Sequence, residues 1–249
     1  MIYAVVNQKG GVGKTTTSVN LAASLALLDK RVLLVDIDSQ ANASSGLGIV
    51  QAPLTMADVI LDGRPIADVV VASRIDGLFV APSGQDLAGA AVELPGRAER
   101  EFVLRRALED VRGSYDIIIL DCPPSLDLIT VNALVGADRL IVPVQCEFYA
   151  LEGLSRLLET ITAVQASLNP GLRVTGMLMT MHDPRTRISA EVIGEVRKHF
   201  GDLAFRAVIP RNVRLAEAPS HGEPVIRYDA ASSGAVAYSQ VAREVLQRD

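Results

Sequence analysis

The amino-acid sequence predicts an α/β protein in which a mostly parallel, twisted sheet carries helices on both faces. Three observations support this prediction: an ordinary globular composition, short apolar β-branched runs that recur along the chain, and stretches of helical apolar spacing between most of those runs. Parallel strands need crossover connections, which the intervening helices supply. The 249 residues, 49% hydrophobic and 21% charged, are enough to bury a core without disulfides or a structural metal.

Seven runs are predicted to form buried strands. They are short and rich in Val, Ile and Leu, and they comprise residues 2–6, 31–36, 78–81, 116–121, 139–144, 174–180 and 204–209. The helices predicted between and after them comprise residues 15–28, 97–111, 126–134, 151–168, 190–200 and 234–246. No linker, repeat or low-complexity stretch interrupts the alternation. We therefore expect one domain over residues 1–249, without a helix-turn-helix extension before it.

The cysteines and the apolar runs exclude several classes of protein. Cys122 and Cys146 stand at no metal-ligand spacing, which argues against a zinc module or a secreted disulfide framework and favours buried thiols in a reducing cytoplasm. The first residues lack the basic segment of a signal peptide. No apolar run reaches the roughly 18 to 20 residues that a membrane-spanning helix needs. We expect a soluble, cytoplasmic protein.

The charge of the chain is modest and uneven. A net charge of −5, an aromatic content of 4% and the absence of Trp argue against a strongly basic or base-stacking nucleic-acid binder. Residues 1–179 hold 14 Lys and Arg against 20 Asp and Glu, whereas residues 180–249 hold 10 against 9. A surface that binds polyanions is therefore expected in the last third of the chain.

The strongest signal is a glycine-rich loop between the first predicted strand and the first predicted helix. It reads Gln8-Lys9-Gly10-Gly11-Val12-Gly13-Lys14-Thr15-Thr16-Thr17. Three glycines let the backbone N–H groups point inward toward phosphates, and the N-terminus of the next helix adds positive partial charge. Lys14 is placed to reach the β- and γ-phosphates, the Thr15 hydroxyl to bind Mg²⁺, and Thr16 to follow toward the α-phosphate. The loop predicts a nucleoside triphosphate site.

A second lysine, Lys9, stands at the entrance of this loop, and Gln8 occupies the position where the usual pattern has glycine. Backbone amides and Lys14 already balance much of the phosphate charge, and Lys9 cannot readily fold into the same pocket. One explanation is that Lys9 binds a phosphate held by a second subunit. A solvated surface lysine is the alternative.

Three aspartates follow predicted strands. Asp36 and Asp38 come after the second strand, and Asp121 ends the strand of residues 116–121. An acid after an apolar strand is typical of a Walker B residue, so Asp121 is expected to hold Mg²⁺. Either of the other two carboxylates can position an attacking water. Each aspartate is alternatively a capping residue at the end of its strand.

Several motifs together resemble the ParA/MinD group of deviant Walker A P-loop ATPases and, within it, the Soj-type, chromosomally encoded ParA branch. These motifs are Lys9-Gly10-Gly11-Val12-Gly13-Lys14-Thr15-Thr16, Asp36-Ile37-Asp38, Asp121-Cys122-Pro123-Pro124-Ser125, Val144-Gln145-Cys146-Glu147 and Ile209-Pro210-Arg211-Asn212-Val213-Arg214-Leu215. The resemblance covers about residues 2–246. It implies a P-loop NTPase fold of the SIMIBI type, ATP and Mg²⁺ as cofactors, and weak ATP hydrolysis.

The resemblance also implies roles for individual residues. The implied catalytic residues are Lys9, Lys14 and Asp38, with Asp38 activating the hydrolytic water and Asp36 supporting it. The implied nucleotide contacts are Lys9, Gly10, Gly11, Val12, Gly13, Lys14, Thr15, Thr16, Pro210 and Asn212, and the implied Mg²⁺ contacts are Thr15, Asp38 and Asp121. Pro210 and Asn212 match the place where the family holds adenine, although a plain turn is the alternative there.

The chain departs from the family pattern directly after Asp38. The family usually continues with Pro-Gln-Gly-Asn, whereas this chain has Ser39-Gln40-Ala41-Asn42. Loss of the proline and the glycine is expected to alter the loop that carries Asp38. The change should affect the rate of hydrolysis more than nucleotide binding.

Basic residues gather late in the chain. Between residues 182 and 214 there are seven Lys and Arg against four acids. By themselves they are consistent with a solvated surface. By resemblance, Arg185 and Arg214 match positions where Soj-type proteins contact DNA, which implies sequence-independent, salt-sensitive contacts to phosphates.

The function that the resemblance implies is chromosome or plasmid partition. ATP would close a homodimer, the dimer would bind nonspecific double-stranded DNA on the nucleoid, and a ParB-like partner would stimulate hydrolysis and release. The alternatives are a MinD-like ATPase at a membrane surface and a metabolic P-loop kinase or synthetase. The last predicted helix is rich in Ala and Val, which favours packing in the core over membrane anchoring.

Overall fold

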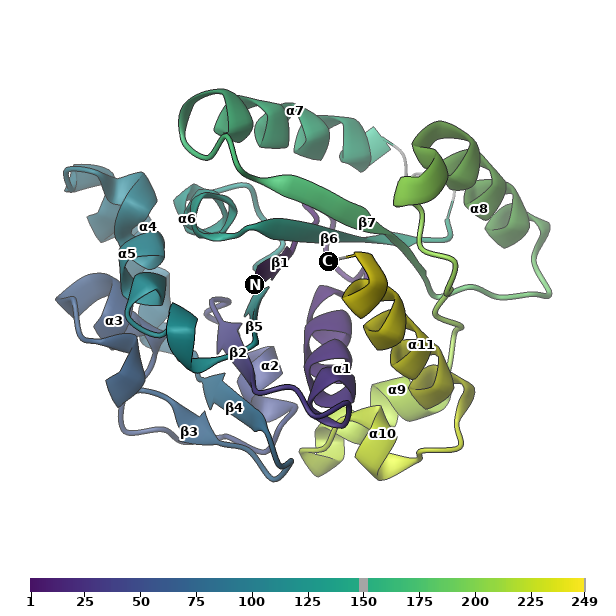
Figure 1. Ribbon diagram of the computed structural model, residues 1–249, viewed down its shortest axis with the longest axis horizontal. Helices are drawn as coiled ribbons and strands as arrows, with labels where there is room; N and C mark the ends of the chain where they lie inside the picture. The colour runs from purple at the N-terminus through teal and green to yellow at the C-terminus, as the bar shows by residue number, and fades with distance from the viewer. Residues whose placement is uncertain (148–151, 249) are drawn as a thin grey trace.

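The computed structural model describes residues 1–147 and 152–248, and within them it has a seven-stranded sheet (Figure 1). The strands are β1 (Ile2–Val5), β2 (Val32–Asp36), β3 (Val71–Ala72), β4 (Leu78–Ala81), β5 (Ile117–Asp121), β6 (Arg139–Gln145) and β7 (Arg173–Thr180). Their order is β3-β4-β2-β5-β1-β6-β7, and every neighbouring pair is parallel except β3 with β4. The predicted mostly parallel sheet is confirmed.

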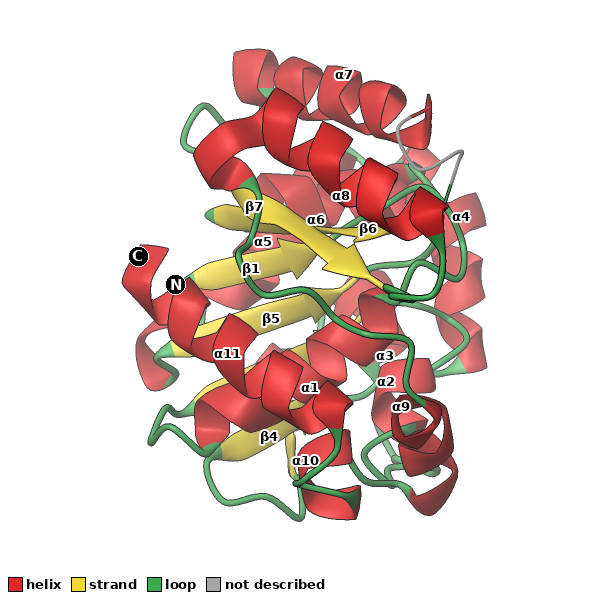
Figure 2. Cartoon of the chain, turned by 90° about the vertical axis from the view of Figure 1, so that its right-hand side faces the viewer, coloured by secondary structure: helices red, strands yellow, loops and turns green. Residues whose placement is uncertain are grey.

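Helices cover both faces of the sheet (Figure 2). One face packs against α1 (Lys14–Ala26), α10 (Val225–Tyr228) and α11 (Ser233–Arg248). The other packs against α3 (Met56–Asp62), α5 (Val103–Glu109), α6 (Leu128–Gly136), α7 (Glu152–Ser167) and α8 (Arg187–Phe200). Shorter helices are α2 (Asn42–Ser45), α4 (Ala90–Glu93) and α9 (Val213–Glu217).

Short 3₁₀ turns connect these elements, at Ile66–Asp68, Gln85–Gly89, Leu94–Gly96, Arg100–Phe102, Arg112–Ser114, Gly201–Leu203 and Ala218–His221. The helix predicted over residues 97–111 is shorter than expected. The segment first forms the 3₁₀ turn Arg100–Phe102, and the α-helix α5 begins only at Val103. Leu151, the first residue of the helix predicted over residues 151–168, lies outside the described residues. The pattern did not predict β3 or α3, although Thr55 and Asp58 form a capping box that starts α3.

The strand predicted over residues 204–209 is wrong. That segment runs beside β7 and pairs with it discontinuously, through the bridges of Met177 with Ala204 and of His182 with Pro210 and through N–H groups of Phe205 and Ile209 that donate to β7 carbonyls. The backbone N–H groups of Arg206 and Ala207 donate to the Glu244 carboxylate of α11, at 2.9 to 3.2 Å, instead of joining a ladder. A side chain from a distant helix therefore interrupts the pairing with β7 that the apolar run suggests.

The C-terminal helix α11 lies along α1 in both views (Figures 1 and 2). Its apolar residues Ala237, Tyr238, Val241 and Val245 are buried in the core that α1 shares. The predicted core packing of this helix is confirmed. Within residues 1–147 and 152–248, no helix has the length and apolarity that a membrane span requires.

Candidate functional site

The glycine-rich loop joins the carboxyl end of β1 to the start of α1. Gly11 and Gly13 have φ angles of 73° and 88°, which an L side chain rarely adopts, so both positions need glycine. The Thr180 hydroxyl, at the end of β7, donates to the Val12 carbonyl at 2.8 Å. Asn7 donates to the Pro143 carbonyl and accepts from the Lys9 amide. The loop is thus fixed to β6 and β7, with the N-terminus of α1 opening into it.

Lys14 is buried inside the loop. Its side-chain ammonium donates to the Lys9 carbonyl at 3.0 Å, and the residue is 6% exposed. Burial lowers the pKa of Lys14, while Asp121 and Asp38 oppose that shift. A cation that has lost its water in this way is placed to bind an anionic group that enters the loop.

The predicted magnesium residues Thr15 and Asp121 are in contact. Asp121 ends β5 fully buried; its Oδ2 accepts from the Thr15 hydroxyl at 2.8 Å and its Oδ1 from the Ser18 hydroxyl at 2.7 Å. A hydroxyl and a carboxylate are hard oxygen donors of the kind that Mg²⁺ prefers. Among the described residues no group of three His, Cys, Asp or Glu forms a metal cage. Such a donor set fits Mg²⁺, which usually takes few protein ligands and completes its shell with waters and substrate phosphates.

Ser18 was not predicted as a site residue. It stands one helical turn after Lys14 and also donates to the Lys14 carbonyl at 3.1 Å. Its position one turn beyond Thr15 on α1 was the available signal, because residues three apart share a helix face.

Asp36 lies beside Asp121, since the two residues pair in the register of β2 and β5. Its carboxylate is fully buried and accepts from the Ser44 amide at 2.9 Å, the Ser44 hydroxyl at 2.7 Å and the Asp38 amide at 3.2 Å. Burial raises the pKa of Asp36 to about 6. Burial, with the neighbouring Asp36 charge, raises the pKa of Asp121 to about 8. The pair of carboxylates therefore favours a proton or a cation between β2 and β5.

Asp38 is placed two residues beyond the end of β2 and is 8% exposed. Its Oδ1 accepts from the Gln40 amide at 3.0 Å. The charges of Asp38 and Asp121 both act on Lys14, which places all three around the mouth of the loop. The structure thus brings together the predicted residues Lys14, Thr15, Asp38 and Asp121.

Lys9 does not enter the pocket of Lys14, as the sequence predicted. Its side chain is 39% exposed, and its ammonium lies 3.8 Å from the Glu147 carboxylate. Glu147 also lies 3.7 Å from the Arg211 guanidinium and accepts from the Gln145 amide at 2.6 Å. The Lys9 ammonium is therefore paired with an acid just beyond the end of β6 and is partly open to solvent.

Pro210 and Asn212 line a cavity of about 290 Å³ next to the loop, together with Gly13, Thr16 and Tyr238. The Asn212 Oδ1 accepts from the Arg214 amide as the N-cap of α9, and its Nδ2 donates to the Ser233 hydroxyl at 2.7 Å. One N–H and one acceptor lone pair remain on this amide. The cavity is positioned to receive a base. Because Asn212 caps α9, its side chain has only this one donor and this one acceptor left for hydrogen bonds to a base.

Tyr238 is a residue of this cavity that the sequence pattern could not find, because it lies on α11, far along the chain. It is fully buried, and its hydroxyl lies 3.1 Å from that of Thr17 on α1. Burial raises the pKa of the Tyr238 hydroxyl well above its usual value. The neutral phenol therefore fastens α11 to the helix that begins at the phosphate loop.

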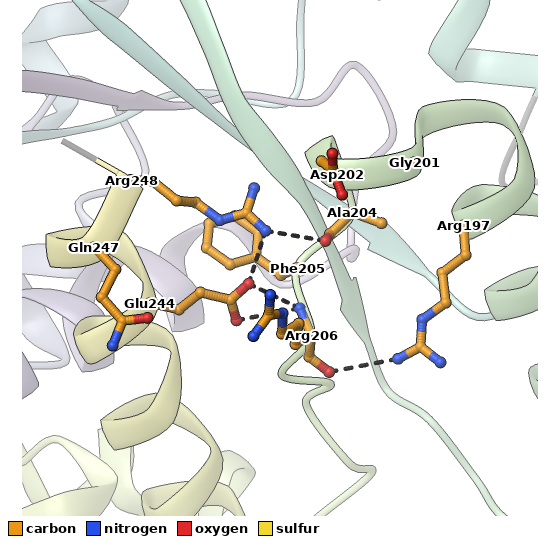
Figure 3. Close-up of a pocket in the computed structure, with 9 residues that line it drawn as sticks. All are labelled: Arg197, Gly201, Asp202, Ala204, Phe205, Arg206, Glu244, Gln247 and Arg248. Atoms are coloured by element: carbon orange, nitrogen blue, oxygen red, sulfur yellow. Dashed lines mark hydrogen bonds and ion pairs between the residues drawn. The ribbon is translucent and has the colours of Figure 1, made fainter.

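A larger cavity, of about 600 Å³, lies elsewhere (Figure 3). It is lined by Arg197, Gly201, Asp202, Ala204, Phe205, Arg206, Glu244, Gln247 and Arg248. The Arg248 guanidinium lies over the Phe205 ring and forms an ion pair with Glu244 at 2.7 Å. None of the lining residues belongs to the phosphate loop or to the strand ends that carry the aspartates. We assign this cavity to the attachment of α11, not to the chemistry.

The two arginines predicted to bind DNA are exposed and already paired with acids. Arg185 forms two hydrogen bonds with Asp183, at 2.9 and 2.7 Å. Arg214 lies 2.9 Å from Glu217 and 3.3 Å from Asp229. The structure places Arg185 after β7 and Arg214 on α9.

A parallel sheet, a phosphate loop at the start of α1, and a Thr15–Asp121 pair beside it define a P-loop nucleoside triphosphatase. The comparisons with known proteins narrow this class. The model of a family described as "AAA domain" matches residues 1–174. The chain is 54% identical to the sporulation initiation inhibitor protein Soj of Bacillus subtilis, over 98% of this chain and 97% of that protein. The chain belongs to the Soj-type ParA family of deviant Walker A ATPases.

A second relative agrees with that assignment, and a solved structure shares the fold. The chromosome partitioning protein ParA of Caulobacter vibrioides is 50% identical over 100% of this chain and 94% of its own length. A solved structure named cobyrinic acid a,c-diamide synthase from Mycobacterium smegmatis, with bound ADP and magnesium, is 37% identical with a TM-score of 0.87, covering 99% of this chain and 94% of that chain. The fold therefore extends to a protein whose name describes a different activity.

Proposed function

We propose that this protein is a chromosome-partitioning ATPase that acts as a molecular switch driven by ATP and Mg²⁺. The observation that carries the proposal is the full-length identity to Soj and ParA combined with a phosphate loop that has two lysines. The protein would act as one ATPase domain over residues 1–249, in the cytoplasm and on the nucleoid. In plasmid partition, the same ATP-driven switch would act on a plasmid in place of a chromosome.

In this mechanism the loop amides and Lys14 hold the β- and γ-phosphates, and the base enters the cavity beside Pro210. Thr15 and Asp121 would hold Mg²⁺, directly or through water, with Asp38 close by. The metal neutralises the developing phosphate charge when it is bound. Asp38 would orient the attacking water from just beyond the carboxyl end of β2. Hydrolysis is expected to be slow because this arrangement supplies a single carboxylate to orient the water.

A second subunit completes the switch. Lys9 is partly exposed and lies beside Glu147, so we propose that it reaches the phosphates of a partner copy when ATP closes a homodimer. The dimer would present two copies of Arg185 and Arg214 to nonspecific double-stranded DNA. A ParB-like partner would then stimulate hydrolysis and return the protein to a monomer.

The test of the switch is retention on arbitrary duplex DNA with ATP, with ADP and without nucleotide. We expect retention with ATP only, and a strong loss in Arg214→Glu. Arg64→Glu is the matched control, because Arg64 is an exposed arginine outside the proposed face. Equal binding in all three nucleotide states would refute the switch.

The dimer step has its own measurement. A hydrolysis-deficient Asp38→Ala protein is expected to elute as a dimer with Mg²⁺ and ATP and as a monomer with ADP, in gel filtration. Lys9→Ala in the same background is expected to remain monomeric. A monomer under all conditions would remove the dimer from the mechanism.

The alternative at a membrane surface has little structural support, because Tyr238, Val241 and Val245 of α11 are buried against the core and Val236 is the one large apolar side chain that the described part of this helix exposes. Pelleting with anionic vesicles in the presence of ATP separates the two functions. We expect no pelleting above the level seen with ADP. Turnover of a small-molecule acceptor would instead indicate a kinase or synthetase.

A further inference from the structure

The loop between Asp38 and α2 has an unfavourable backbone conformation at one residue. Ala41 has φ 52° and ψ 32°, in the left-handed region that glycine adopts easily and alanine does not. Asn and Asp tolerate this region because their side chains form local hydrogen bonds, but a methyl group cannot do so. The strain at Ala41 must therefore be balanced by contacts made elsewhere.

Those contacts converge on Asp36. Its buried carboxylate accepts from the Asp38 amide at one end of the loop and from both the amide and the hydroxyl of Ser44 at the other. The Ser44 hydroxyl in turn accepts from the Ser83 amide at 3.0 Å, which ties α2 to the segment after β4. One carboxylate thus holds both ends of a loop of seven residues.

Neither water nor a cation competes strongly for the Asp36 carboxylate in the described part of the chain. Asp36 is fully buried, Ser44 is 1% exposed, and no cation of the described chain forms an ion pair with Asp36. Hydrogen bonds to a carboxylate are stronger than neutral ones, and a low local dielectric strengthens them further. They are suited to hold a conformation that the Ala41 backbone resists.

We propose that Asp36 and Ser44 are positioning residues that hold the loop, and with it the Asp38 carboxylate, against the backbone strain at Ala41. The inference rests on the proposed function, in which Asp38 orients the hydrolytic water. Ser44 belongs neither to the phosphate loop nor to the base cavity. It acts on hydrolysis through the placement of Asp38, and not through the affinity for ATP.

Ser44→Ala removes one of the two hydrogen bonds that Ser44 makes to Asp36. We expect kcat at saturating Mg²⁺ and ATP to fall about tenfold, the effect of losing about one hydrogen bond to a charged group. The KM for ATP and the equilibrium binding of a non-hydrolysable ATP analogue should stay unchanged. Ser45→Ala is the matched control, because the exposed Ser45 hydroxyl donates only to the Asn42 carbonyl of its own helix.

Ala41→Gly supplies the decisive second variant. In the double variant Ser44→Ala with Ala41→Gly, the placed loop is no longer strained, so we expect at least about threefold recovery of kcat over Ser44→Ala alone. A purely structural role of Ser44 would not be rescued by a change at Ala41. A double variant no faster than Ser44→Ala, an unchanged kcat in Ser44→Ala, or a loss confined to KM overturns the proposal.

Ala41→Gly by itself keeps the proposal testable if Ser44→Ala does not fold. We expect the Ser44 amide to exchange with solvent more slowly in Ala41→Gly than in the wild type, because relief of strain favours the placed loop. Exchange that is unchanged or faster contradicts the proposal. Absence of Mg²⁺-dependent ATP hydrolysis in the wild type, or its persistence in Asp38→Ala, would instead overturn the proposed function.

Discussion

At the scale of single residues, the nucleotide site is a set of charges held out of water. Lys14 and Asp121 are both buried, and the Asp121 carboxylate is satisfied by two hydroxyls, from Thr15 and Ser18, and not by a cation. Burial lowers the pKa of Lys14 and raises the pKa of Asp121, so it favours the neutral form of each side chain. Binding of Mg²⁺ and phosphate would supply the opposite charges that this arrangement lacks.

The raised pKa of Asp121 makes the stability of the metal-free protein depend on pH. The native state holds a proton that the unfolded chain releases, so this contribution is present below about pH 4 and is lost as pH rises toward about 8. We expect the melting temperature of the wild type, measured in EDTA, to fall over this range relative to Asp121→Asn. Thermal unfolding at pH 5 and pH 8 checks this, and a pH-independent difference between the two proteins would contradict it.

The ion pair of Asp183 with Arg185 predicts that the acid restrains DNA binding. The Asp183 carboxylate takes two donors of the Arg185 side chain, and Arg185 in turn lowers the pKa of Asp183. Asp183→Asn should raise the affinity for arbitrary duplex DNA several-fold with ATP, because the guanidinium is released to phosphates. Asp202→Asn makes the same change of net charge away from Arg185, and an equal effect there would show that only net charge matters.

At the scale of elements, α11 is the part that organises the edge of the sheet. Figure 3 shows the Glu244 carboxylate beside the Arg206 backbone and the Arg248 guanidinium, which also donates to the Ala204 carbonyl. Glu244 accepts from the Ala207 N–H as well, and Arg248 donates to the Thr175 carbonyl of β7. These contacts join α11, β7 and the segment that leads to Pro210. The position of Pro210 in the base cavity thus depends on α11, the last helix of the chain.

Glu244→Ala should therefore destabilise the protein substantially. One exposed and one partly buried backbone N–H group lose their acceptor, and the Arg248 guanidinium loses one of its three acceptors, which corresponds to about 2–3 kcal/mol of unfolding free energy. Denaturant unfolding measures the change. Glu191→Ala removes an exposed ion pair with Arg187 and is expected to cost less than about 1 kcal/mol. Similar losses in the two variants would disprove the role of Glu244.

At the scale of the whole molecule, an acidic protein is expected to bind DNA only in pairs. The net charge of −5 opposes a polyanion, and the arginines proposed for DNA lie beside acids in each subunit. A dimer doubles the number of phosphate contacts, and each contact adds about 0.9 to the salt dependence of binding. If strong DNA binding needs the weak basic faces of two subunits together, ATP would control the affinity for DNA by controlling dimer formation.

The salt dependence gives a direct measurement of this idea. With ATP, log K for DNA should fall steeply and linearly with log salt, and the slope should be about halved for Lys9→Ala, which is expected to stay monomeric. Arg214→Glu should lower the slope by about two contacts in the dimer. A slope that is the same for wild type and Lys9→Ala would show that DNA binding does not need the pair.

Local patterns in the sequence were enough to predict the parallel sheet and the phosphate loop. Apolar runs fixed six of the strands, and Gly11, Gly13, Lys14 and Thr15 carry their chemistry within one continuous segment. The aspartates at the strand ends were found for the same reason, since parallel strands bring their carboxyl ends to one edge. These features depend on periodicity and on short-range geometry.

Contacts between distant segments decided the rest. Tyr238 and Ser44 each bond to a residue far along the chain, Thr17 and Ser83, and the Glu244 carboxylate accepts from two N–H groups within the segment predicted as a strand. Whether an N–H group pairs with a strand or with a carboxylate depends on which is nearer in the folded chain. The sequence alone thus determined the class of site, and the tertiary structure decided what holds Asp38, the base cavity and the two arginines in place.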